Sequence, residues 1–129
     1  MHSPKPAPVP LITRVSRSLF WLALVFASVM AVLPKPPHTP IDRFGDKFAH
    51  ILAFTVLTVL ANLGFPKTER IRIVERLCFL GAVIEVVQSI PELHRDCDIR
   101  DWVADSLAVL VVTTGFVLYA RWQRSRRSS

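Results

Sequence analysis

Four long apolar segments, separated by short charged stretches, dominate the sequence. They cover residues 18–33, 48–65, 71–90 and 102–120. Each is close to the roughly 20 residues that an α-helix needs to cross the hydrocarbon core of a bilayer. The first and the last are apolar on every side, so they lack the polar face that a helix of a small soluble bundle presents to water. The pattern predicts an all-α fold, a four-helix transmembrane bundle.

The segments outside these helices divide the chain. Residues 1–15 are predicted to be a flexible proline-rich segment, residues 16–122 the membrane domain, and residues 123–129 a basic tail. Arg17 before the first helix is typical of a signal peptide as well, but Pro34 and Lys35 follow directly where a cleavage site would be expected. We therefore expect the first helix to be retained.

A short interfacial helix is predicted before the second span. Thr39 suits the N-cap position and Pro40 the first helical position. Ile41, Phe44 and Phe48 would then share one face. An apolar face of this kind favours a helix that lies along the outer membrane surface.

The basic residues indicate the orientation. Eleven of the 16 precede the first helix, lie between the second and third, or follow the fourth: Lys5, Arg14, Arg17, Lys67, Arg70, Arg72, Arg76, Arg121, Arg124, Arg126 and Arg127. The positive-inside rule therefore places both termini and the middle loop in the cytoplasm. The pI of about 10.2 reflects these topology signals and contacts with anionic lipids. It is not evidence for a nucleic-acid partner.

Polar residues gather at the outer ends of the last three helices. Within each pair the two residues are three or four positions apart, so both side chains share a helix face. The pairs are Asp46 with His50, Glu85 with Gln88, and Asp101 with Asp105. Small residues such as Gly81 continue these faces and favour close helix packing. The sequence predicts one polar cluster that faces outward, and Lys47, Arg95 and Asp98 belong to the same side.

His50 and Glu85 are the catalytic candidates in this cluster. A carboxylate inside a membrane helix is costly and usually marks a substrate or proton site. A histidine one turn from Asp46 has a carboxylate that can orient it for acid–base work. Arg95 presents a fork that suits phosphate. Structural alternatives stay open: Glu85 pairing with Arg95 or His50, and Asp98 and Asp101 serving the start of the fourth helix, with Asp98 as its N-cap.

No metal site or cofactor is predicted, because the acidic residues show no recognised ligand spacing. The set formed by His50, Glu85, Asp101 and Asp105 is nevertheless rich in oxygen, and a hard divalent cation is left open for it. Cys78 and Cys97 are expected near opposite membrane surfaces, which excludes a disulfide between them.

Three motifs in this order resemble the VanZ-like membrane proteins. They are "DKFAH" at residues 46–50, "GAVIEVVQ" at residues 81–88 and "RDCDIRDWVAD" at residues 95–105. The chain departs from the family pattern at Asp105, where Asn is common, and at Ala108, where Gly is common. The resemblance implies a multi-pass protein of the bacterial inner membrane that acts at the cell envelope. The namesake of the family is linked to resistance to the glycopeptide teicoplanin.

Three functions are compatible with this sequence. The first is an outward polar pocket that binds or processes the head group of an envelope lipid, as an enzyme or as a binding protein. The second is a small proton-coupled transporter of cations or drugs. The third is a structural membrane protein whose polar cluster holds the helices together. Membrane lipids are the expected partners in each case, and a homodimer is left open.

Overall fold

The computed structural model describes residues 3–34, 45–95 and 97–129, with Asp46 described by its backbone alone. These described residues form four α-helices and one short 3-10 helix. They are α1 (Leu11–Val32), α2 (Asp46–Gly64), α3 (Arg70–Gln88), the 3-10 helix η2 (Pro91–Leu93) and α4 (Ile99–Ser128). The described residues contain no strand. The all-α prediction is confirmed.

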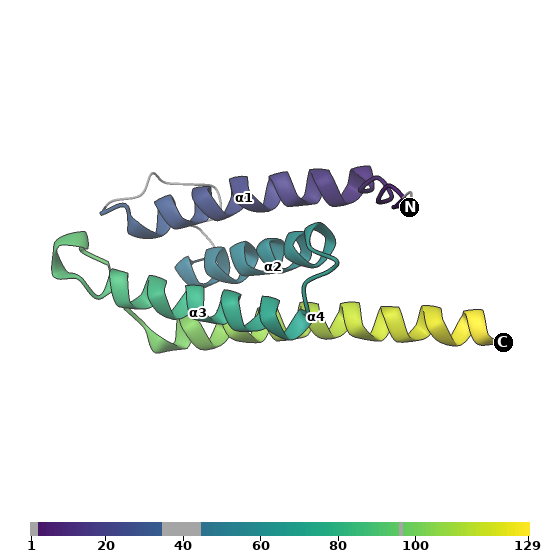
Figure 1. Cartoon of the computed structure of the whole chain (residues 1–129). Coiled ribbons are helices and arrows are strands. Elements are labelled where there is room, and N and C mark those ends of the chain that lie inside the picture. Colours follow the sequence, from purple (N-terminus) through teal and green to yellow (C-terminus); the bar gives the residue numbers. More distant parts are fainter. Residues whose placement is uncertain (1–2, 35–44, 96) are drawn as a thin grey trace.

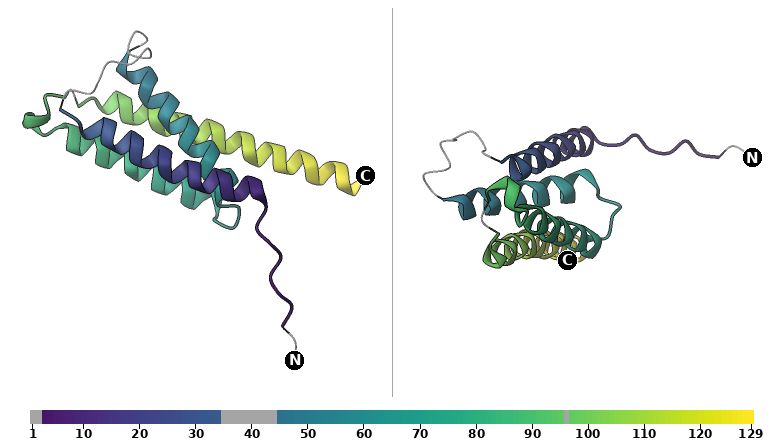
Figure 2. Two further views of the ribbon diagram at one scale, coloured as in Figure 1. Left: turned by 90° about the horizontal axis from the view of Figure 1, so that it is seen from above. Right: turned by 90° about the vertical axis from the view of Figure 1, so that its left-hand side faces the viewer.

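The four helices alternate in direction (Figure 1). α1 and α3 run one way and α2 and α4 the other, so the two ends of the chain lie at the same end of the bundle (Figures 1 and 2). α2 packs against α1 on one side and α4 on the other, and α3 packs mainly against α4. This order brings the N-terminal ends of α2 and α4 beside the C-terminal end of α3.

Three of these helices are long and apolar enough to cross a membrane: α1, α4, and α2 from Lys47 to Gly64. Many of their large apolar side chains are exposed on the outside of the bundle, among them Leu22, Phe26 and Val111. A soluble monomer rarely exposes apolar surface on this scale. The chain is therefore a membrane protein.

The helix bounds differ from the predicted spans at both ends of the chain. α1 begins at Leu11, directly after Pro10. Val9 precedes this proline, and a residue before proline is biased away from the helical conformation. α4 runs to Ser128, so the residues predicted as a separate basic tail extend the helix. Its last turn carries Arg126 and Arg127, which interact favourably with the helix dipole. The predicted interfacial helix lies outside the described residues, apart from Phe48, which is part of α2.

Close backbone packing joins α1 and α2 at the end of the bundle that holds the termini. A Cβ atom on Gly64 would lie 2.8 Å from the backbone nitrogen of Arg17, so only glycine fits there. The Arg17 side chain donates from Nε to the Gly64 carbonyl at 3.0 Å. At the same end, Arg70 donates to Asn62 at 2.8 Å and lies over the ring of Phe116. These contacts hold α1, α2, α3 and α4 together on the side away from the polar cluster.

Candidate functional site

His50 and Asp105 form a buried pair between α2 and α4. His50 Nδ1 lies 3.2 Å from Asp105 Oδ2. The Asp105 residue is 1% exposed and lies in the second turn of α4, and the His50 side chain, near the start of α2, is 11% exposed. The sequence predicted Asp46 as the carboxylate that orients His50; the Asp46 side chain lies outside the described residues. The carboxylate that the structure gives to His50 comes from a different helix.

Glu85 enters the same space from the C-terminal end of α3. It is 6% exposed, and its Oε2 accepts a hydrogen bond from the backbone N–H of Asp98 at 3.2 Å. One ligand atom each from His50, Glu85 and Asp105 lie within 4.8 Å of one another. These three residues, named the His50 cluster below, come from three helices. The predicted convergence of α2, α3 and α4 on one polar cluster matches this geometry.

Two oxygens of the cluster have no hydrogen-bond partner among the described residues. They are Glu85 Oε1 and Asp105 Oδ1, and both are buried. The thiol of Cys97, a weak donor, lies beside the Glu85 carboxylate. Buried carboxylate oxygens in native proteins are normally paired, and an unpaired one calls for an explanation. The cluster therefore has capacity to accept a proton donor or a cation.

Charged residues also lie between the His50 cluster and the end of the bundle. Lys47 Nζ lies 3.7 Å from Asp101 Oδ1, with the lysine half-exposed and the aspartate largely buried. Asp98 accepts a hydrogen bond from the backbone N–H of Arg100 at 2.9 Å, which confirms it as the N-cap of α4. The Asp98 carboxylate thus has a structural role at this rim.

Two other predicted site residues do not join the His50 cluster. Gln88 is buried, but its side-chain amide donates to the Ala31 carbonyl at 3.1 Å and so ties α3 to α1. Arg95 lies half-buried in the loop between η2 and α4. Within the described part of the chain it forms no ion pair with Glu85, so this structural alternative for Glu85 is absent there.

Cys97 borders the cluster, although the sequence predicted only that it forms no disulfide with Cys78. It is free and exposed, in the loop before α4. Partial loss of hydration, the hydrogen bond to Glu85 and the negative charges of Glu85, Asp98 and Asp101 all raise the pKa of the Cys97 thiol. Its position beside Glu85 could not be read from the sequence, because the two residues are 12 positions apart and belong to different elements.

Close packing of α3 fixes the position of Glu85. A Cβ atom on Gly81 would lie 3.2 Å from the Trp102 ring and 3.4 Å from the Phe54 ring. Trp102 Nε1 also donates to the Cys78 carbonyl at 2.9 Å, which joins α4 to α3. The prediction that Gly81 allows close helix approach is confirmed. Glu85, one turn further along α3, is held by this contact against α2 and α4.

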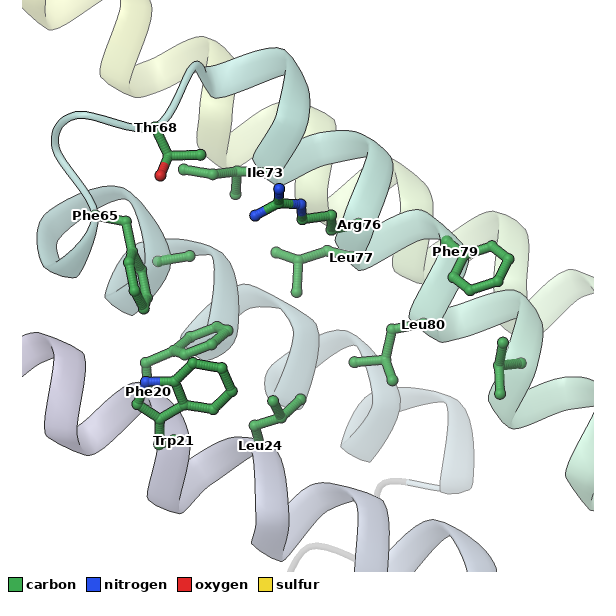
Figure 3. A pocket seen from close by; sticks show the side chains of 12 residues that line it. Phe20, Trp21, Leu24, Phe65, Thr68, Ile73, Arg76, Leu77, Phe79 and Leu80 are labelled. Carbon is green, nitrogen blue, oxygen red and sulfur yellow. The ribbon is translucent and has the colours of Figure 1, made fainter.

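A cavity of about 430 Å³ lies elsewhere, between α1, α2 and α3 (Figure 3). Its lining is almost entirely apolar and includes Phe20, Trp21, Phe65 and Leu77, with Arg76 as its charged member. None of the predicted site residues lines it. The cavity is on the half of the bundle that holds the termini, and it is separate from the His50 cluster.

Comparison with protein-family models, curated proteins and solved structures found no match to this chain.

Proposed function

We propose that this chain is a VanZ-like protein of the bacterial inner membrane, crossing it four times with both termini in the cytoplasm. α2 and α4 run in the same direction (Figure 1), so α3 has to return the chain across the same thickness. The charges of α3 gather mainly in its first two turns, at Arg70, Arg72, Glu75 and Arg76. They lie at the end of the bundle that holds the termini, which suits a cytoplasmic surface.

In this orientation the His50 cluster faces outward, and we infer that it binds the head group of an envelope lipid. The observation that carries this proposal is the pair of unpartnered buried oxygens on Glu85 and Asp105. Burying two carboxylates inside a membrane helix bundle costs free energy. In a purely structural role, hydrogen bonds to both oxygens would be expected to offset this cost. Lys47 and Arg95 lie at the same end and offer positive charge to a lipid phosphate.

The His50–Asp105 pair supports acid–base chemistry on such a head group. A carboxylate 3.2 Å from the imidazole fixes its orientation and favours its protonated form once it has taken a proton from water or substrate. Glu85, with one unpaired oxygen, is the second group that can exchange a proton. Hydrolysis or transfer at the head group is the reaction class that these roles fit. His50 and Glu85 remain the catalytic candidates.

Lipid retention tests the proposal. Wild type, Glu85→Gln and the control Glu75→Gln are purified in mild detergent, and copurifying lipids are identified by mass spectrometry. Glu75 is on the same helix but is exposed and paired with Arg72 at the opposite end. We expect wild type and Glu75→Gln to retain an envelope lipid that Glu85→Gln loses. Identical lipid profiles in all three would contradict the proposal and favour a structural or transport role.

Turnover is then tested with the retained lipid. Wild type is incubated with it, and release of the head group is followed by mass spectrometry. An enzyme predicts that His50→Gln abolishes release while the variant protein still accumulates and retains the lipid. A binding protein predicts no release by either form.

A further inference from the structure

We propose that His50, Glu85 and Asp105 bind a divalent metal ion. The three residues supply one ligand atom each within 4.8 Å of one another, from α2, α3 and α4. A first-row divalent ion binds nitrogen and oxygen at about 2.1 Å, which puts adjacent ligand atoms about 3 Å apart and opposite ones about 4 Å apart. The 3.2 Å between His50 Nδ1 and Asp105 Oδ2 matches adjacent ligands. Only small adjustments of the carboxylates would close the site around one ion.

The unpartnered oxygens supply independent support for a bound ligand. Glu85 is 6% exposed and Asp105 is 1% exposed, so both side chains are more than nine-tenths buried. Each has one carboxylate oxygen without a hydrogen bond among the described residues. Buried carboxylates are normally paired with a cation or coordinate a metal. A single ion bound by both carboxylates, with Asp105 bidentate through Oδ1 and Oδ2, would satisfy the unpartnered oxygens and offset the repulsion between the two charges.

The charges around the cluster favour a cation over a neutral ligand. The amine of Lys47 is engaged by Asp101. Asp98 and Asp101 add negative charge on the side of the rim, and the thiol of Cys97 lies beside Glu85. Among the described residues, Glu85 has no ion pair with a lysine or an arginine. An ion of charge +2 would balance two carboxylates in this space.

The ligand set indicates the class of metal. One imidazole and two carboxylates suit Mn²⁺, Fe²⁺ or Zn²⁺ better than Ca²⁺, which prefers six to eight oxygens. Three protein ligands leave coordination positions open for water or for an oxygen of a bound molecule. An open position of this kind is what separates a reactive or ligand-binding metal site from a purely structural one. Such an ion would also allow a phosphate to approach an otherwise acidic cluster.

The metal site does not depend on the lipid proposal, and its test uses metal alone. The full chain is purified in detergent, stripped with EDTA and titrated with Mn²⁺, and bound ion is measured by electron paramagnetic resonance. The same titration is done with Glu85→Gln, Asp105→Asn and the control Glu75→Gln, which keeps the net charge equal to that of Glu85→Gln. We expect one ion per chain in wild type and in the control. Each cluster variant should bind at least about tenfold more weakly, because a direct ligand is lost.

A second measurement keeps the proposal testable if a variant does not fold. Spin-echo modulation of Mn²⁺ bound to wild type should show a directly bound imidazole nitrogen, and His50→Gln should remove it. Equal binding by wild type and all variants, or bound Mn²⁺ without a nitrogen ligand in wild type, would overturn the metal site. Failure of the lipid-retention test would leave these results unchanged, so the two proposals can fail separately.

Discussion

Replacing Glu85 by Gln should stabilise the metal-free protein, although the residue is buried between α2, α3 and α4. Ligand atoms of Glu85 and Asp105 lie within 4.8 Å. At the effective dielectric constant of about 20 that describes protein interiors, two negative charges at this distance repel each other by at least about 3 kcal/mol. Gln has nearly the same shape, removes one of the charges, and offers an N–H group to the unpaired oxygen of Asp105.

Some stabilisation is lost in the same substitution. The backbone N–H of Asp98 donates to a charged oxygen in wild type and to a neutral amide oxygen in the variant. A hydrogen bond to a charged group is stronger by about 1 kcal/mol than one between neutral groups. The net expectation is a gain of about 2 kcal/mol, or a rise of roughly 5–10 °C in the unfolding midpoint for a chain of this size.

The assay is thermal unfolding in detergent with EDTA at pH 8, followed by circular dichroism. Glu75→Gln is the control, because an exposed ion pair such as the one it forms with Arg72 contributes less than about 1 kcal/mol. Addition of Mn²⁺ should raise the midpoint of wild type by more than that of Glu85→Gln, because the variant binds the ion at least about tenfold more weakly. A midpoint that falls in metal-free Glu85→Gln would refute the reasoning, because it would mean that the carboxylate holds the helices together.

Two substitutions test the packing of the helices, and one alkylation experiment tests the rim of the site. Gly64→Ala should destabilise the bundle by about 1–3 kcal/mol in thermal unfolding, because the new Cβ atom would lie 2.8 Å from the Arg17 backbone. The control Gly115→Ala has open space around it and should be neutral or stabilising by up to about 1 kcal/mol. Equal effects of the two substitutions would contradict the close contact of Gly64 with α1. The rate at which a membrane-impermeant maleimide alkylates Cys97 should keep rising as the pH increases beyond 9.0. The raised pKa of the Cys97 thiol keeps the reactive thiolate scarce below that pH. A rate that levels off below pH 9.0 would contradict a raised pKa. Trp102→Phe should destabilise the bundle by about 1 kcal/mol, because the 2.9 Å hydrogen bond from Trp102 to α3 is lost. The same unfolding assay compares this variant with wild type. An unchanged midpoint would show that the hydrogen bond contributes nothing to stability.

The sequence by itself determined the helices and the ends at which their polar residues gather. Apolar segments of about 20 residues have one stable form in lipid, because a helix satisfies all of its backbone hydrogen bonds internally. Short connections then make consecutive helices antiparallel, and this placed the start of α2, the end of α3 and the start of α4 together. The N-cap role of Asp98 and the close contact at Gly81 followed from local rules in the same way.

Only the tertiary structure decided which polar groups meet. Helical spacing says which residues share a face, but the rotation of each helix about its axis depends on packing against its neighbours. For this reason the sequence could not show that His50 pairs with Asp105, or that the amide of Gln88 points toward α1 instead of the cluster. The contact of Gly64 with Arg17 and the unpaired oxygens of Glu85 and Asp105 likewise depend on distances between helices. Those oxygens, on which both proposals depend, exist only because three helices pack around them.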